Sequence, residues 1–301
     1  MQRRLPIPPG GDPAFSPLAD ARMYWPVQRA RLQAAVRDGF QMVIGVPLER
    51  MIFKLWKHEL LGSTWVKQLG LPRRVVEQQL DTRLILHVNP RELVHIRDWR
   101  ELPKRRRPSS SAFIWNGDWD LRREDLRYGS RYRFISDIDI HRDDLTVSDT
   151  FRGLKARVDS GQPWSSHQQG LLLDTEERIL IYLRVYLNFM DDMALNGFDQ
   201  QKGKDELGVA VSRDGRLIKI NRGLHRLAMA QYLGLPTVPV KVKAVHQDWW
   251  EKVTQKTHGA KALERMVKAL QYCVPETEPG PLDPQSFPES FIWPPGKGSH
   301  R

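Results

Sequence analysis

Residues 207–243 read LGVAVSRDGRLIKINRGLHRLAMAQYLGLPTVPVKVK, and this stretch decides the fold class. An apolar run at 207–211 is followed by the turn sequence Ser-Arg-Asp-Gly and by a second apolar run. Short apolar runs on either side of an Asp-Gly turn predict a β-hairpin. The small and apolar residues that follow predict a helix ending at Gly234, and 238–242 predict a further strand. The expected order is therefore strand, turn, strand, helix, strand.

The hairpin leads directly into Arg222, Gly223, His225 and Arg226, at the start of the predicted helix. The first backbone N–H groups of a helix have no intrahelical partners, and the positive end of the helix dipole lies there. Gly223 allows a ligand to approach the backbone closely, while the basic side chains supply charge-assisted donors. By spacing alone, a phosphate-binding site and a purely structural helix cap explain this pattern equally well.

Upstream of this stretch the sequence predicts a mixture of strands and helices. Short strands are expected at 84–88 and 113–115, and a third at 132–140 because its residues alternate. The longest predicted helix spans 175–196, since Thr175 suits the N-cap and Asn196-Gly197 suits a left-handed stop. The fold class is therefore α+β: a small mixed β-sheet with flanking helices, preceded by a helical N-terminal segment.

Composition shifts divide the chain into five segments. The predicted segments are a flexible lead-in at 1–20, a helical N-terminal segment at 21–80 with helices over 26–40 and 48–69, an α+β domain at 84–246, a C-terminal helix at 247–273, and a flexible proline-rich tail at 274–301.

Bulk composition favours a soluble protein with an anionic partner. Hydrophobic residues make up 40% of the 301 residues and the formal net charge is +11. No apolar run approaches the roughly 18 residues needed to span a membrane, and the single cysteine, Cys273, excludes an internal disulfide. A cytoplasmic location is expected. The segment from Arg97 to Arg133 carries eleven Lys and Arg against six Asp and Glu, so it is either a solvated surface or a nucleic-acid contact.

The order of motifs over 174–243 resembles the second half of the ParB/sulfiredoxin superfamily. Gly223 matches the motif glycine, and His225 and Arg226 match the basic pair that contacts nucleotide phosphates in that superfamily. Residues 88–90, Val-Asn-Pro, look like the opening strand and Asn-Pro step of ParB-like domains, which extends the resemblance back to residue 84. The resemblance implies a ParB/sulfiredoxin-type sheet that binds ATP or CTP.

One functional hypothesis from this resemblance is an ATP-using phosphotransferase of the small-molecule kinase type. Such chemistry requires a carboxylate that activates a hydroxyl or holds Mg²⁺ near the phosphates. The candidate catalytic carboxylates are Glu92, Asp118 and Asp120, and the candidate metal ligands are Asp137 and Asp139. Asp at a turn is also favoured for local hydrogen bonding, so each has a structural explanation as well.

The alternative is a non-catalytic nucleotide-gated or nucleic-acid-associated binding protein, and a nuclease is a third option. Sulfiredoxins place their reactive cysteine between the motif glycine and histidine, and Leu224 holds that position here. Thiol reductase chemistry is therefore not implied. ParB proteins of chromosome partitioning continue into a helix-turn-helix DNA reader, whereas about one helix and a tail follow residue 243. Magnesium-dependent turnover of nucleotide would separate the kinase from the binding protein.

Overall fold

The computed structural model describes residues 12–60, 66, 70–100, 102–104, 107–202, 206–220, 222–283 and 291–296. The chain divides into two compact units, each assembled from separate stretches of sequence. Unit 1 contains Met1–Met42, Ser130–Lys204 and Lys297–Arg301, and unit 2 contains Val43–Gly129 and Asp205–Gly296. Part of the predicted 84–246 domain, 130–204, therefore belongs to unit 1.

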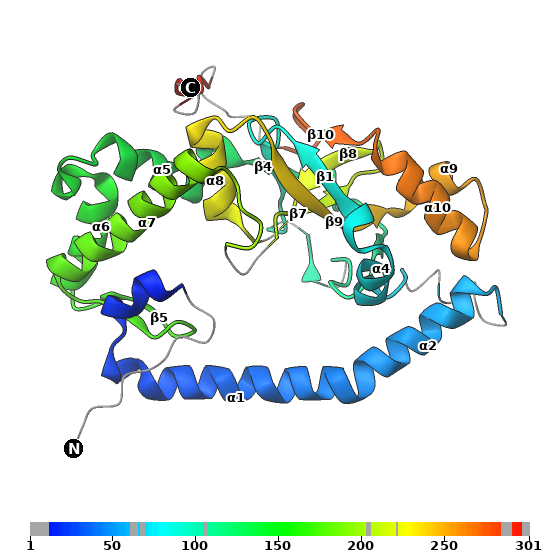
Figure 1. The fold of residues 1–301 in the computed structure, drawn as a ribbon, viewed down its shortest axis with the longest axis horizontal. Helices are drawn as coiled ribbons and strands as arrows, with labels where there is room; N and C mark the ends of the chain where they lie inside the picture. The colour runs from blue at the N-terminus through cyan, green and yellow to red at the C-terminus, as the bar shows by residue number, and fades with distance from the viewer. Residues whose placement is uncertain are drawn as a thin grey trace. The chain divides into compact units, whose positions relative to one another are not determined.

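Unit 1 is mainly helical (Figure 1). Its elements are η1 (Pro13–Leu18), η2 (Ala21–Met23), α1 (Tyr24–Phe40), α5 (Ser130–Ile140), η7 (Leu145–Val147), α6 (Asp149–Asp159), the antiparallel pair β5 (Trp164–Ser166) and β6 (Leu171–Leu173), and α7 (Glu176–Asn196). α7 confirms the predicted helix with its caps, because the Thr175 side chain accepts a hydrogen bond from the Arg178 backbone and Gly197 ends the helix at φ 75°.

Two sequence predictions fail within unit 1. The expected strand at 132–140 is the helix α5, because its buried residues Tyr132, Ile135 and Ile138 recur every three positions and form one helical face. Within the expected lead-in, residues 13–18 form η1. Phe15 is buried there and packs against the rings of Tyr182 and Tyr186 at 5.7 and 5.6 Å, so aromatic burial orders this stretch. Residues 1–11 lie outside the described ranges.

Unit 2 is built on one mixed sheet. Among the described residues its strands are β1 (Ile85–Val88), β2 (His95–Arg97), β3 (Ile114–Trp115), β4 (Arg123–Asp125), β7 (Gly208–Val211), β8 (Arg216–Lys219), β9 (Val238–His246) and β10 (Val274–Pro275). The main order is β1-β9-β7-β8-β2-β4, with β3 paired to β9 and β10 paired to β8. β7 and β8 form the predicted antiparallel hairpin, and β8 runs parallel to β2.

Helices flank this sheet. They are α2 (Val46–Lys57), α4 (Arg73–Leu80), α8 (Leu224–Leu233), α9 (Gln247–Thr254) and α10 (Gly259–Leu270), with the short turns η3 (Gln41–Gly45), η4 (Asp81–Leu84) and η6 (Leu126–Tyr128) between elements. A core cluster covers one face of the sheet, and its members are Ala112, Trp115, Trp119, Ala210, Ile218, Ile220 and Ala244. Burial of both faces explains why every residue of β7 is buried.

Several boundaries in unit 2 differ from the sequence predictions. The helix expected over 48–69 ends at Lys57, and 61–65 and 67–69 lie outside the described residues. The last predicted helix is two helices, because Gln255 and Lys256 adopt left-handed backbone angles of φ 50° and 61° and stop α9. The two helices that replace it are α9 and α10.

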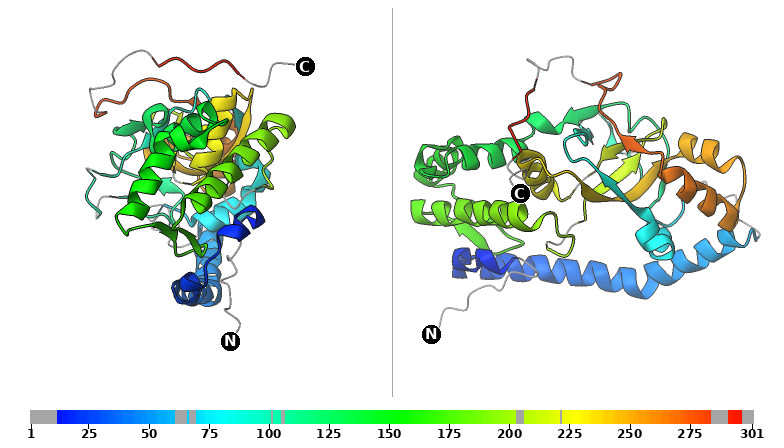
Figure 2. Two further views of the ribbon diagram at one scale, coloured as in Figure 1. Left: turned by 90° about the vertical axis from the view of Figure 1, so that its left-hand side faces the viewer. Right: turned by 45° about the horizontal axis from the view of Figure 1, so that its top comes forward.

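Part of the expected flexible tail contacts unit 2. β10 extends the sheet in parallel beside β8 (Figure 2). Glu276, which is buried, forms an ion pair with Arg123 at 3.0 Å. Phe291 packs edge to face on Tyr128, with ring centroids 5.7 Å apart, and the Pro294 carbonyl accepts a 2.7 Å hydrogen bond from Arg91. Aromatic and proline residues thus hold parts of this segment, whereas 284–290 and 297–301 lie outside the described ranges.

Candidate functional site

The turn between β8 and α8 has an unusual backbone. Arg222 has φ 80°, in the left-handed region that non-glycine residues rarely adopt. Gly223 follows at φ 67° and is the N-cap of α8, with no side chain to cap the helix. Two successive residues with positive φ turn the chain sharply from the strand into the helix. Strain of this kind is retained where surrounding contacts hold it in place.

Lys219, the last residue of β8, supplies such contacts. Its side chain is fully buried, and its Nζ donates hydrogen bonds to the carbonyl of Ile220 and, at 2.6 Å, to that of Arg222. A buried ammonium is costly unless its donors are satisfied, and here turn carbonyls satisfy them. Lys219 therefore fixes the turn that precedes α8. Sequence reasoning overlooked it, although a lysine within the apolar run Leu-Ile-Lys-Ile was a visible signal.

The first turn of α8 places His225 and Arg226 directly after Gly223, both half-buried. The first backbone bond of the helix runs from Leu227 N–H to the Gly223 carbonyl at 2.9 Å, so the amides that precede it have no intrahelical acceptor. No Asp or Glu occurs anywhere from residue 215 to 247 of the sequence. The local chain thus brings basic side chains and the positive end of a helix dipole together.

Glu92 lies toward the other end of α8. It is exposed in the turn after β1 and accepts a 3.3 Å hydrogen bond from Asn89. The neighbouring Arg91 donates to the carbonyl of Gln231 at 2.8 Å, in the last turn of α8. A helix rises about 1.5 Å per residue, so Arg91 contacts α8 about 12 Å from Gly223. The structure therefore does not bring Glu92 next to the first turn of α8.

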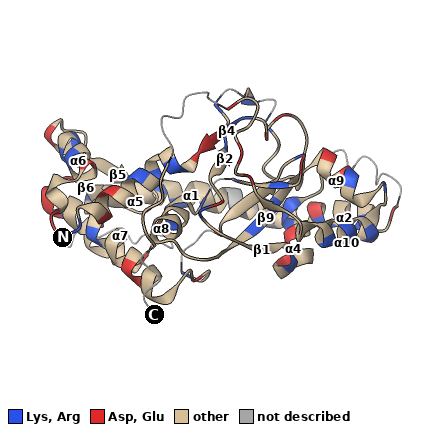
Figure 3. Cartoon of the chain, turned by 90° about the horizontal axis from the view of Figure 1, so that it is seen from above, with Lys and Arg blue, Asp and Glu red and all other residues tan. Residues whose placement is uncertain are grey.

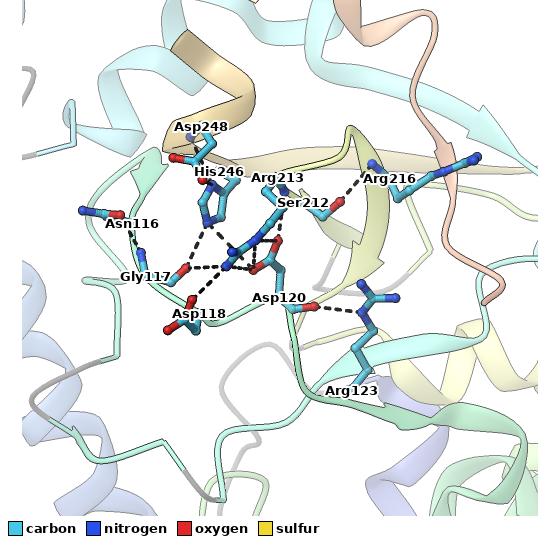
Figure 4. A network of polar contacts seen from close by, with 10 residues as sticks. All are labelled: Asn116, Gly117, Asp118, Asp120, Arg123, Ser212, Arg213, Arg216, His246 and Asp248. Atoms are coloured by element: carbon cyan, nitrogen blue, oxygen red, sulfur yellow. Dashed lines mark hydrogen bonds and ion pairs between the residues drawn. The ribbon is translucent and has the colours of Figure 1, made fainter. Parts of the chain in front are cut away.

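Asp118 and Asp120 surround Arg213 in the β7–β8 turn (Figure 4). Asp120 is buried and accepts hydrogen bonds from the Arg213 backbone N–H at 2.9 Å and from Arg213 Nη2 at 2.8 Å. The exposed Asp118 is 3.1 Å from the same guanidinium. Arg213 precedes β8 and Gly223 follows it, so a strand of about 13 Å separates these carboxylates from the start of α8.

The electrostatics of Asp120 fit a structural ion pair. Burial raises the pKa of its carboxyl, but hydrogen bonds from Arg213 outweigh burial and hold that pKa below its usual range. A general base near neutral pH needs a higher pKa than this. Asp120 is therefore ionised and committed to Arg213.

His246 closes this network as a satisfied structural residue. Its Nδ1 accepts a 3.1 Å hydrogen bond from the Asp248 backbone N–H, which leaves Nε2 to donate to the Gly117 carbonyl at 2.9 Å. The Trp119 ring stacks on the imidazole with centroids 5.9 Å apart. His246 thereby caps α9 and secures the turn that carries Asp118 and Asp120.

Asp137 and Asp139 lie on the helix α5 in unit 1, where Asp137 faces His141 one turn later but Asp139 lies on another side of the helix. Asp137 accepts a 2.7 Å hydrogen bond from the Thr150 backbone at the start of α6, and its carboxylate is 3.2 Å from His141. Asp139 is buried and accepts a 2.7 Å hydrogen bond from Arg142. Both carboxylates serve helix packing. Across the described part of the chain, no cluster of three or more His, Cys, Asp or Glu has a geometry that could hold a metal ion.

Charge is distributed over many elements. Lys and Arg occur together with Glu on α2 and α10, and Lys also occurs on β9 (Figure 3). In the described residues, no helix is long and apolar enough to cross a bilayer. The basic residues next to Gly223 differ from those of α2 and α10 because the surrounding sequence, 215–247, contains no Asp or Glu.

Comparison with known proteins gives no relative. The chain matches no family model, no curated protein and no solved structure. Its function must therefore be argued from its own residues.

Proposed function

We propose that this chain is a nucleotide-binding protein of ParB/sulfiredoxin type, in which the N-terminus of α8 binds a phosphate group of ATP or CTP. The observation that carries the proposal is the left-handed turn at Arg222 and Gly223, fixed from beneath by buried Lys219. It leads into a helix whose first turn carries His225 and Arg226. Backbone amides and a guanidinium fork together match the acceptor oxygens of a phosphate.

Binding without phosphoryl transfer is the form of this function that the geometry favours. Transfer requires a carboxylate close to the phosphates. Asp120 is committed to Arg213 beyond the far end of β8, and Glu92 lies by the last turn of α8. Leu224 occupies the position of the sulfiredoxin cysteine. Burial raises the pKa of the Cys273 thiol to about 12, so Cys273 does not supply a reactive thiolate near neutral pH.

The first experiment is a thermal-shift panel with ATP, ADP, CTP and GTP, each with and without Mg²⁺. A ligand that binds only the folded state raises its stability by mass action. We expect stabilisation by at least one nucleotide. Absence of any shift with all four contradicts the proposal, and consumption of ATP with a hydroxylated acceptor would favour the phosphotransferase.

The decisive variant is Arg226→Ala. Loss of a charge-assisted hydrogen-bonding fork costs about 1.5 to 3 kcal/mol of binding, so nucleotide affinity should fall roughly ten- to hundred-fold. A cation at a helix N-terminus is mildly unfavourable without an anion, so thermal stability without ligand should change little.

Two further variants serve as controls. Arg216→Ala removes an exposed guanidinium at the other end of β8 and should leave nucleotide affinity unchanged. Leu224→Ala removes a half-buried apolar side chain and should lower stability more than affinity. Arg226 is structural if Arg226→Ala unfolds the protein while its folded fraction binds nucleotide normally.

A further inference from the structure

The chain that follows β2 stacks a guanidinium between indole rings. The Arg97 guanidinium carbon lies 3.8 Å from the centroid of the Trp99 ring and 5.5 Å from that of Trp115. Arg97 Nε and Nη1 are shielded from solvent and have no hydrogen-bond partner within the described part of the chain. Stacking on aromatic faces orients a guanidinium without satisfying its N–H donors. Two buried donors thus remain available to an acceptor.

A second guanidinium shares the same indole. The Arg107 guanidinium carbon lies 5.9 Å from the centroid of the Trp99 ring, while Arg107 Nε donates to the Leu102 carbonyl at 2.8 Å and Nη2 to the Trp99 carbonyl at 2.6 Å. These bonds hold Arg107 near the same indole as Arg97, although the charge of Arg107 acts unfavourably on that of Arg97. Burial and the Arg107 charge lower the pKa of Arg97 to about 9, so the Arg97 guanidinium is still cationic at neutral pH.

Two described carboxylates near Arg97, that of the next residue in the chain and that of the residue paired with Ile96 across the sheet, are engaged by other arginines. Asp98 is 2.9 Å from Arg122 Nε, and Glu124 is 2.7 Å from Arg100 Nη2. The described residues show no ion pair for Arg97 or Arg107 with any Asp or Glu. Burying a cation without a counter-ion is unfavourable, and an anion between the two guanidinium groups removes that penalty.

This cluster is distinct from the turn before α8. Ile96 lies opposite Lys219 in the parallel pairing of β2 with β8. Side chains alternate along a strand, so Arg97 projects from the opposite face of the sheet to Lys219. It also packs with the tryptophans of the core cluster, on the face that carries Ile218 and Ile220. Arg97 stands at the carboxyl end of β2, where ligands of parallel strands commonly bind.

We propose that Arg97 and Arg107, held on Trp99, form a second phosphate-binding site. The guanidinium fork of Arg97 binds two oxygens of a phosphate group, and Arg107 adds the second positive charge. A nucleotide and a nucleic-acid backbone both supply this chemistry. The site does not depend on phosphate binding at α8, because no residue is shared between the two.

The test is titration of the full chain with inorganic phosphate and pyrophosphate, followed by tryptophan fluorescence and thermal shift. Arg97→Gln keeps hydrogen-bond donors but removes the charge, and pyrophosphate affinity should fall at least about tenfold. Arg100→Gln is the matched control, because its guanidinium is exposed and paired with Glu124, and affinity should change less than about twofold. Trp99→Phe should abolish the pyrophosphate-dependent fluorescence change.

Two further ligands distinguish the source of the phosphate. If Arg97→Gln weakens a single-stranded oligonucleotide but leaves ATP unchanged, the site takes a nucleic-acid backbone, and the opposite result assigns it to a nucleotide. The Arg226→Ala variant should still bind pyrophosphate at the Arg97 site, so failure of the α8 site is distinguishable from failure of this one.

One result overturns the proposal. If Arg97→Gln binds pyrophosphate, ATP and the oligonucleotide as tightly as the unaltered chain, the guanidinium only packs against indole. Should Arg97→Gln fail to fold, Arg97→Lys is the replacement, since it keeps the charge and removes the fork. Its pyrophosphate affinity should fall several-fold, and equal affinity rejects the site.

Discussion

The two ends of strand β8 use basic residues in opposite ways. Before the strand, Arg213 is enclosed by Asp118 and Asp120, and its charge is neutralised within the fold. After the strand, Lys219 fixes a left-handed turn, and Arg226 follows in a region of the chain without a carboxylate. The contrast shows how a single strand can separate a structural ion pair from a candidate ligand site. A buried charge partner within the fold, such as Asp120 for Arg213, marks a contribution to stability.

The largest effect expected from this comparison is that of Asp120→Asn. It leaves Arg213 without its buried counter-charge, so the free energy of unfolding should fall by about 3 kcal/mol, measured by urea denaturation at pH 7. Nucleotide affinity of the folded protein should remain unchanged. Asp118→Asn is the matched control, because that carboxylate is exposed, and it should cost less than about 1 kcal/mol.

Because hydrogen bonds from Arg213 hold the pKa of Asp120 below its usual range, the stabilisation from Asp120 is present above about pH 4 and is lost as pH falls through the lowered pKa. In acid denaturation, the Asp120→Asn variant should therefore lose less stability than the unaltered chain over that pH range. A large loss of nucleotide binding in Asp120→Asn at pH 7 would contradict this separation, because the two ends of β8 would then act as one site.

A smaller effect is expected for Lys219→Met, at the other end of the strand. Methionine fills most of the same volume but leaves the carbonyls of Ile220 and Arg222 without their donor. The free energy of unfolding should fall by about 1 to 2 kcal/mol, and nucleotide affinity should fall along with it because the turn before α8 loses its support. Thermal denaturation and nucleotide titration of one preparation measure both. Unchanged nucleotide affinity in this variant would show that Lys219 does not support ligand binding at the N-terminus of α8.

The smallest effect concerns His95, on the strand beside β8. It is buried, its Nε2 lies 3.3 Å from the Thr277 carbonyl, and burial lowers the pKa of its imidazole. The unfolded chain therefore binds a proton below about pH 6.5 while the folded chain does not, so stability falls as pH drops through that window. The slope contributed by one such group is at most about 1.4 kcal/mol per pH unit.

Urea denaturation at pH 7.5 and 5.5 measures this dependence. His95→Asn should flatten it, while nucleotide affinity at pH 7.5 stays unchanged. A pH dependence identical to that of the unaltered chain would assign the acid sensitivity to other histidines.

Elements whose signals are local could be predicted from the amino-acid sequence. α7 has its caps at Thr175 and Gly197, the β7–β8 hairpin has its Asp-Gly turn, and α8 ends at Gly234. Each of these depends on residues within one turn or one hairpin, where backbone preferences decide the structure. The basic turn at Gly223 was recognisable for the same reason.

Contacts between residues far apart in the chain became visible only in the folded protein. Alternation over 132–140 predicted a strand, but burial every third residue made it the helix α5, because packing overrides weak local preference. Asp120 and Arg213 are 93 positions apart, and no local pattern could reveal their pairing. The stacking of Arg97 on the indoles of Trp99 and Trp115 likewise depends on the fold, because a strand and a loop bring these side chains together. Charge neutralisation and burial are properties of neighbours in space, so only the fold shows that Asp120 is a structural carboxylate paired with Arg213.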